Sequence, residues 1–248
     1  CWKGGTTSGI AGSADITPNA YSFNQTSGFS IVTYNGTDVN GNTVLHGLGS
    51  VPQVIFVKRR VSSGYDWVVY HKNDVAGLYL NTDGNNNDSS NTNIWFNGNT
   101  PTSTQFHIGT DGRIGDNVSA GAFVAYCFAE KQGYSKFGTY TGNGNNDGTF
   151  VYTGFRPAWG MFKRTDNTAD WYIYDNKRNT FNVLDDRLEA NENGAETADG
   201  GDGNTVDFLS NGFKLRGSGG SMNDGTFIYM CFAEQPFVNS NGVPANAR

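Results

Sequence analysis

Residues 52–59 read Pro52-Gln-Val-Ile-Phe-Val-Lys-Arg59, and residues 157–164 read Pro157-Ala-Trp-Gly-Met-Phe-Lys-Arg164. Both stretches open with a proline, continue with an apolar run and close with a lysine–arginine pair, and the two prolines lie 105 positions apart. Proline is tolerated at the first residue of a β-strand, where its missing N–H removes no ladder hydrogen bond. The pair therefore predicts the same strand in two copies of one unit.

Further matches at nearly the same spacing extend the repeat along the chain. Cys127-Phe-Ala-Glu130 returns letter for letter as Cys231-Phe-Ala-Glu234, and Asp66-Trp-Val-Val-Tyr70 returns as Asp170-Trp-Tyr-Ile-Tyr174. The spacings drift only between 104 and 106 residues, as single-residue changes in surface loops would produce. Each unit is long enough to bury its own core, so the sequence predicts two tandem domains and not a solenoid of short repeats.

The repeat also sets the expected domain boundaries. Residues 28–131 form the first predicted domain and residues 132–248 the second. Residues 1–27 are interpreted as the end of a preceding repeat followed by a Gly/Ser/Thr-rich linker. This interpretation arises because Cys1-Trp2 can be superposed on Cys127-Phe128, which predicts that Cys1 ends an upstream copy.

The composition predicts an all-β protein with antiparallel, sandwich-like domains. Glycine is abundant (34 residues), and Asn-Gly and Asp-Gly pairs, which suit hairpin turns, separate short aromatic and β-branched runs. Predicted strands in the first domain are 29–34, 53–60, 66–71, 77–81, 93–96, 105–109 and 120–130. Predicted strands in the second domain are 136–140, 149–152, 159–163, 170–174, 206–209, 212–216 and 226–234. One short helix is predicted at 176–189, where Leu184, Arg187 and Leu188 would share a face.

The net charge of −6 argues against a nucleic-acid or anionic-membrane partner, because both would favour a basic face. No apolar run approaches the roughly 18 residues that a membrane-spanning helix needs. Cys127 and Cys231 lie at the same place in their repeats, within apolar runs, and are predicted to be small buried thiols of core strands.

No motif indicates a zinc site or a catalytic nucleophile. The histidines His46, His71 and His107 all lie in the first repeat; Val151 and Asp175 are matched with the first two in the second repeat. Such scattered, unrepeated histidines favour packing or surface roles. We therefore predict no catalytic, cofactor-binding or metal-binding residues and no cofactor.

Three loops rich in Asp and Asn, residues 81–88, 143–147 and 192–202, are candidate calcium sites, since calcium prefers several oxygen ligands. None has the twelve-residue EF-hand spacing with its closing glutamate. Polar hairpin tips are the preferred interpretation.

The repeated charged residues are interpreted as structural. Lys58-Arg59 and Lys163-Arg164 are expected to be solvated strand ends that pair with Asp66 and Asp170 at the start of the next strand. Asp66 and Glu130 recur as Asp170 and Glu234, so a hydrolase using these carboxylates is the least favoured alternative. The aromatic residues Trp95, Tyr134 and Tyr152 would either stack on sugar rings or lie in the core.

Longer motifs resemble a domain found in tandem in long virion proteins of marine tailed bacteriophages, where it follows a laminin-G-like (concanavalin-type) jelly roll. The resemblance covers nearly the whole chain and rests on Cys1-Trp-Lys-Gly-Gly5, Gly28-Phe-Ser-Ile-Val-Thr-Tyr34, His46-Gly-Leu-Gly49, Val57-Lys-Arg-Arg60, Tyr126-Cys-Phe-Ala-Glu130, Gly133-Tyr-Ser-Lys-Phe-Gly138, Phe150-Val-Tyr-Thr-Gly-Phe-Arg-Pro157, Asp207-Phe-Leu-Ser-Asn-Gly-Phe-Lys-Leu-Arg216 and Asn246-Ala-Arg248.

The resemblance implies a non-enzymatic structural component on the virion surface, and it brings no catalytic residues. The expected function is a fibre or other appendage that adheres to a host-surface polysaccharide through many weak loop contacts. The expected partners are further copies of the chain, with a trimer by analogy to fibre proteins, and other virion proteins. A head decoration protein bound to the capsid is the alternative.

Overall fold

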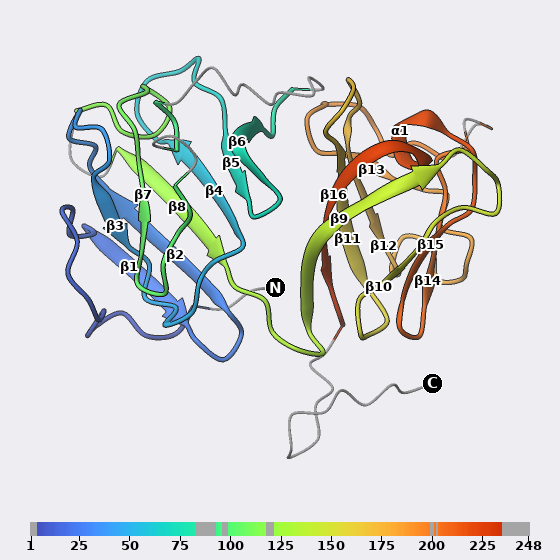
Figure 1. Cartoon of the computed structure of the whole chain (residues 1–248), viewed down its shortest axis with the longest axis horizontal. Helices are drawn as coiled ribbons and strands as arrows, with labels where there is room; N and C mark the ends of the chain where they lie inside the picture. The colour runs from blue at the N-terminus through green and yellow to red at the C-terminus, as the bar shows by residue number, and fades with distance from the viewer. Residues whose placement is uncertain are drawn as a thin grey trace. The chain divides into compact units, whose positions relative to one another are not determined.

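The computed structural model describes residues 4–82, 93–95, 99–117, 122–198, 201 and 203–234 (Figure 1). It is nearly all β, with 41% strand, and α1 (Gly220–Asn223) is the helix of the described residues. The all-β, sandwich-like class is confirmed. Residues 1–80 with 86–130 form one compact unit, and residues 81–85 with 131–248 form the other; they are called unit 1 and unit 2 below.

Unit 1 contains a six-stranded and a two-stranded antiparallel sheet. The larger sheet has the order β1 (Ala20–Asn24), β2 (Phe29–Tyr34), β8 (Phe123–Phe128), β4 (Val54–Arg59), β5 (Val68–His71) and β6 (Asp74–Tyr79). The smaller sheet pairs β3 (Thr43–Leu45) with β7 (Gln105–His107).

Unit 2 contains a five-stranded and a three-stranded antiparallel sheet. The larger sheet has the order β9 (Ser135–Asn143), β16 (Asp224–Phe232), β11 (Trp159–Arg164), β12 (Trp171–Asp175) and β13 (Leu188–Glu189). The smaller sheet has the order β10 (Phe150–Tyr152), β15 (Gly212–Leu215) and β14 (Val206–Leu209).

The larger sheets of the two units correspond strand by strand. The order β2-β8-β4-β5-β6 in unit 1 matches the order β9-β16-β11-β12-β13 in unit 2. The registers agree as well, because Cys127 lies opposite Ile55 and Cys231 lies opposite Gly160. In the small sheets, Val44 pairs with Phe106 just as Val151 pairs with Phe213. Equivalent positions can therefore be read directly from the strand pairing.

Each unit has its own hydrophobic core, to which both of its sheets contribute. The larger sheet of unit 1 supplies Val32 and Ile55, and the smaller sheet supplies Phe106. In unit 2, Phe162 and Phe213 fill the corresponding space. The two cysteines are buried in these cores, as predicted, and burial raises the pKa of Cys127 to about 12. A thiol with so high a pKa is inert.

The helix predicted at 176–189 is wrong: the segment forms turns and ends in the short strand β13. Asn179 accounts for much of this, because its side chain bonds to Asp185 and Asp186 and competes with helical backbone bonds. The strand predicted at 93–96 is also wrong over its described part, since residues 93–95 form a turn; Phe96 lies outside the described residues.

The segment predicted as a linker is paired with unit 1 over its described part. The Ile16 amide donates to the Thr43 carbonyl, Thr6 bridges Phe23, and residues 20–24 form β1. Its apolar side chains are few but well placed, since Ile16 and Phe23 are both buried. The superposition of Cys1-Trp2 on an upstream copy falls outside the described residues.

Candidate functional site

The repeated lysines hold loops from within. Nζ of Lys58 donates to the carbonyl of Tyr65 and lies 5.8 Å from the centroid of the Trp67 indole. Nζ of Lys163 donates to the carbonyl of Ala169 and lies 6.0 Å from the centroid of the equivalent indole, that of Trp171. Lys163 is fully buried, so the expectation of a solvated strand end is wrong. Neither lysine is presented to a ligand.

The repeated arginines also bind loops of their own unit. Arg59 donates to the carbonyl of Gly112 at 2.8 Å, and Arg164 donates to the carbonyl of Gly220 at 2.6 Å. Each guanidinium also pairs with a carboxylate that differs from the predicted one: Asp116 for Arg59 and Asp166 for Arg164. The arginine thus fastens the loop before the last strand in both units, which the sequence could not show because that loop is distant in the chain.

The four repeated carboxylates have separate partners. Asp66 binds Arg113 at 3.0 Å, Glu130 binds Lys72 at 2.7 Å, and Glu234 binds Lys177 at 2.6 Å. Asp170 accepts a hydrogen bond of 2.7 Å from the side-chain amide of Asn191. The hydrogen bond from Lys177 lowers the pKa of Glu234. Acid–base hydrolysis needs two carboxylates with opposed pKa shifts beside one groove, and these contacts instead give each carboxylate a structural partner.

His46 is a buried structural residue. Its Nδ1 accepts from the amide of Leu48 at 3.2 Å, and its Nε2 lies 3.2 Å from the carbonyl of Thr102, which fixes the neutral Nε2–H tautomer. Burial lowers its pKa to about 4. The strand registers make Thr153 the residue of unit 2 that is equivalent to His46. This corrects the match to Val151 that was made from the sequence.

His71 and Asp175 are equivalent, as predicted, because they pair with Val54 and Trp159 at the starts of β4 and β11. His71 is buried and accepts from the amide of Asn73, whereas His107 lies 3.4 Å from the carbonyl of Gly41. Within the described ranges, the structure shows no group of three or more metal-ligating side chains.

The Asp/Asn-rich loop 143–147 is held by hydrogen bonds and an ion pair, but it is not a hairpin tip, because it connects β9 of the five-stranded sheet to β10 of the three-stranded sheet. In the loop 143–147, Asn143 accepts from the amide of Asn145, and Asp147 pairs with Lys214 at 2.7 Å. Residues 83–88 of the first loop, and residues 199, 200 and 202 of the third, lie outside the described residues.

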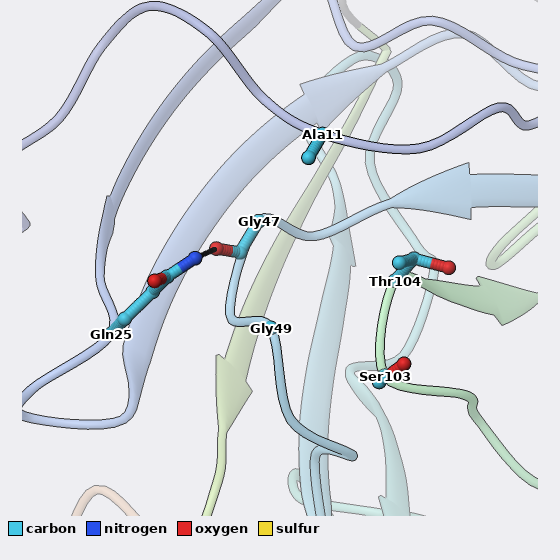
Figure 2. Close-up of a pocket in the computed structure, with 6 residues that line it drawn as sticks. All are labelled: Ala11, Gln25, Gly47, Gly49, Ser103 and Thr104. Atoms are coloured by element: carbon cyan, nitrogen blue, oxygen red, sulfur yellow. Dashed lines mark hydrogen bonds between the residues drawn. The ribbon is translucent and has the colours of Figure 1, made fainter.

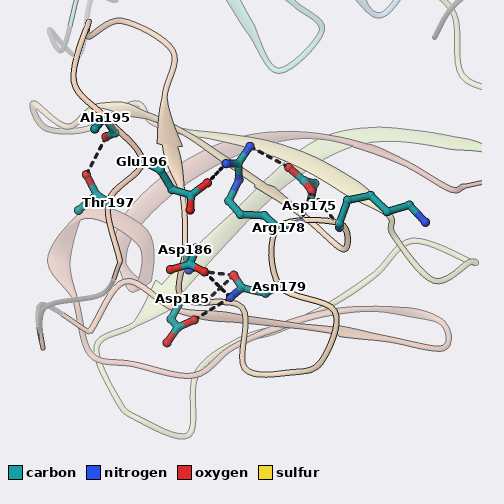
Figure 3. Close-up of polar contacts among 9 residues, drawn as sticks. Asp175, Arg178, Asn179, Asp185, Asp186, Ala195, Glu196 and Thr197 are labelled. Atoms are coloured by element: carbon teal, nitrogen blue, oxygen red, sulfur yellow. Dashed lines mark hydrogen bonds and ion pairs between the residues drawn. The ribbon is translucent and has the colours of Figure 1, made fainter.

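The turn after β12 is closed by its own charges (Figure 3). Arg178 pairs with Asp175 and with Glu196, so it joins the two arms of the loop. Asn179 makes hydrogen bonds to Asp185 and Asp186. These polar groups satisfy one another and hold the backbone that presents Phe181, a strongly exposed aromatic side chain.

A pocket in unit 1 is too small for a ligand. It is lined by Ala11, Gln25, Gly47, Gly49, Ser103 and Thr104, and its volume is about 30 Å³ (Figure 2). Gln25 donates to the Gly47 carbonyl at 3.0 Å across its rim. Such a volume holds about one water molecule.

The three aromatic residues considered from the sequence have different environments. Trp95 is buried and packs against Tyr70, and Tyr134 is half-buried against Phe232. Tyr152 is 62% exposed, and Phe150, two residues earlier on β10, is 44% exposed. Residues two apart on a strand share a face. The two rings therefore stand on the same outer face of the small sheet of unit 2.

Polar side chains flank these rings. Across the sheet, Phe150 pairs with Lys214, which pairs with Asp207; Tyr152 pairs with Gly212. Gly212 has no side chain, and the edge of the Phe150 ring lies 3.1 Å from where its Cβ would be. We call Phe150, Tyr152, Asp207, Gly212 and Lys214 the aromatic face.

The equivalent face of unit 1 is covered. Thr43 and Leu45 stand where Phe150 and Tyr152 stand, and each is only 6% exposed. Asp15 accepts from the amide and the hydroxyl of Thr43, and Ile16 pairs alongside β3. Unit 2 begins β9 shortly after residue 130 and has no such N-terminal segment before it. The aromatic face is thus a feature of unit 2 that unit 1 lacks.

Comparison with known proteins places the chain in one family. Residues 1–236 match the model of a family described as Domain of unknown function (DUF7483). No curated protein and no solved structure matches the chain. The structure holds no described helix long and apolar enough to cross a membrane. The chain belongs to the DUF7483 family, whose match extends over both units.

Proposed function

We propose that the protein is a structural component of a bacteriophage virion, a fibre or surface appendage that adheres to a host-surface glycan through the aromatic face of unit 2. The virion setting rests on the sequence resemblance. The adhesive role rests on one observation above all: Phe150 and Tyr152 are exposed side by side, where the equivalent residues of unit 1 are covered.

The aromatic face has the chemistry that sugar binding requires. A pyranose ring presents C–H groups that pack on an aromatic ring and hydroxyls that need hydrogen-bonding partners. Lys214 and Asp207 lie in the same cross-strand row as Phe150, and Asp147 is an exposed carboxylate held by Lys214. A shallow face of this kind binds weakly, and several copies on one particle raise the effective affinity.

The internal use of the repeated charged residues favours binding over catalysis. Lys58, Lys163, Arg59 and Arg164 fasten loops, and the repeated carboxylates make separate polar contacts. The hydrolase alternative would need a polysaccharide to be shortened by the purified chain. A head decoration protein remains the second candidate, in which the aromatic face would lie against the capsid.

The adhesive proposal is tested by binding of the purified full chain to an array of bacterial surface polysaccharides. We expect a subset to bind, and Tyr152→Ala and Phe150→Ala each to weaken binding about tenfold or more, because exposed aromatic anchors carry much of such an interface. Phe181→Ala is the matched control, since it removes an exposed ring outside the aromatic face.

Equal losses in all three variants would mean nonspecific hydrophobic adsorption and would overturn the assignment of the face. Shortening of a polysaccharide during the assay would replace adhesion with hydrolysis.

A further inference from the structure

We propose that Asn193-Gly194 in unit 2 is a site of spontaneous deamidation in the folded protein, at which the side-chain amide of Asn193 is replaced by a carboxylate. The proposal does not depend on glycan binding, because the loop concerned carries none of the residues of the aromatic face.

The reaction needs an accessible asparagine and an unhindered residue after it. The backbone nitrogen of that next residue attacks Cγ of the asparagine, and the new N–C bond closes a five-membered succinimide ring. The bond from Cγ to the side-chain nitrogen breaks, and ammonia leaves with the proton of the backbone amide. Water then adds to either carbonyl of the ring and opens it to aspartate or isoaspartate. Glycine is the most favourable next residue, because it has no Cβ and its backbone is conformationally free.

The chain contains several Asn-Gly pairs, and their sequence does not distinguish them, because the following residue is always the same. The pairs that the structure describes begin at Asn35, Asn40, Asn143, Asn193 and Asn211. The pairs at residues 97–98 and 241–242 lie outside the described residues. The folded environment therefore decides which of the described pairs reacts.

The other described pairs are held by the fold. The backbone amides of Gly41 and Gly144 donate to backbone carbonyls, and these nitrogens would have to make the attack. The side-chain oxygen of Asn35 accepts a hydrogen bond of 2.8 Å, and Gly36 after it is buried. Gly212 is buried within β15. Ring closure at these pairs requires local opening of the structure.

The reacting atoms of Asn193-Gly194 are not restrained in this way. Both residues are exposed, and within the described part of the chain no hydrogen bond reaches the Asn193 side chain or the Gly194 amide. Beyond its chain neighbours, nothing lies within 4 Å of where a Cβ of Gly194 would be. The succinimide ring can therefore form without displacing a neighbouring element.

The two ends of this loop are fixed, which confines the effect of the reaction to the loop. The side chain of Asn191 accepts from the backbone amide of Trp171 at 2.7 Å, and Arg187 and Thr197 exchange two backbone hydrogen bonds. Isoaspartate lengthens the main chain by one methylene between these anchors. Residues 192–196 are exposed and belong to no strand, so we expect the product to keep the fold of unit 2.

Peptide mapping by mass spectrometry of the full chain, incubated in the folded state at mildly alkaline pH, tests the proposal. We expect position 193 to deamidate at least about tenfold faster than positions 35, 40, 143 and 211, because those positions react only through local opening. In urea, where the chain is unfolded, the rates should become similar. The comparison separates the effect of the fold from that of the sequence.

Gly194→Ala is the matched variant. Its added methyl group hinders attack on Cγ of Asn193, and the open space around it leaves the fold unchanged, so deamidation at position 193 should slow severalfold. Equal rates at the described pairs in the folded protein, or a faster reaction at another of them, overturns the proposal. A rate at position 193 that Gly194→Ala leaves unchanged overturns it as well.

Discussion

The hydroxyls of Tyr34 and Tyr140 donate hydrogen bonds to equivalent loops of the two units. The hydroxyl of Tyr34 donates to the carbonyl of Ile114 at 2.8 Å, and that of Tyr140 donates to the carbonyl of Met222 at 2.8 Å. Both rings are buried. At the scale of single residues, repetition in this chain therefore marks internal support. Binding is proposed instead at positions where the two copies differ.

His46 makes the stability of unit 1 depend on pH. Its folded pKa of about 4 is below the usual value of 6.5, so the unfolded chain takes up a proton first as the pH falls. The contribution of neutral His46 to the free energy of unfolding is fully present above pH 6.5 and is lost as the pH falls to 4. The loss is about 3 kcal/mol, because each unit of pKa shift corresponds to about 1.36 kcal/mol. Urea unfolding at several pH values measures this loss.

His46→Gln is the control for this prediction, because glutamine does not titrate. The variant should lose less stability than the wild type between pH 6.5 and pH 4, while the effect of the carboxylates at lower pH remains. Identical pH profiles for the two proteins would refute the assignment.

Among the elements, the strands with long apolar runs were predictable and those defined by their partners were not. β4, β11 and β16 lie within predicted boundaries or within one or two residues of them. β1 and β3 were missed. β1 lies in a Gly/Ser/Thr-rich stretch, and both strands are defined by their pairing partners, β2 and Thr6 for β1 and β7 for β3. The apolar spacing of residues 176–189 predicted a helix. The segment does not form one, because the side chain of Asn179 makes hydrogen bonds that compete with helical backbone bonds.

Gly212 is required for the close approach of β10 to β15. A Cβ at this position would lie 2.0 Å from the carbonyl oxygen of Val151, so the strands would have to separate. Gly212→Ala should destabilise unit 2 by roughly 1–3 kcal/mol and weaken glycan binding with it, since β10 carries Phe150 and Tyr152. Thermal unfolding and the polysaccharide array measure the two effects.

Gly194→Ala is the matched control, because nothing lies within 4 Å of a Cβ at that site. Its stability should stay within about 0.5 kcal/mol of the wild type. A Gly212→Ala variant as stable as this control would show that β10 does not need the glycine.

For the whole molecule, the composition and the Asn-Gly and Asp-Gly turn signals predicted the all-β class, which the structure confirms, and the strand orders of the two units agree. The candidate site was less predictable. Tyr152 was one of three aromatic candidates, and Phe150 was not singled out. Their exposure depends on whether an N-terminal segment covers the sheet, and the packing of residues such as Ile16 shows this only in three dimensions.

The separate cores predict that damage stays within a unit. Tyr34→Phe and Tyr140→Phe each leave a buried carbonyl without its tyrosine partner, at a cost of about 1–3 kcal/mol. Hydrogen exchange should rise in unit 1 for the first variant and in unit 2 for the second. Equal increases throughout the chain in both variants would instead indicate one cooperative body.

The central proposal, an adhesive appendage, is tested most directly by a cryo-electron microscopy map of the virion that contains this chain. We expect density that projects from the particle, with Phe150 and Tyr152 of unit 2 free to contact a host glycan. Density seated on the capsid, with those two residues against the shell, would contradict adhesion and make the protein a head decoration.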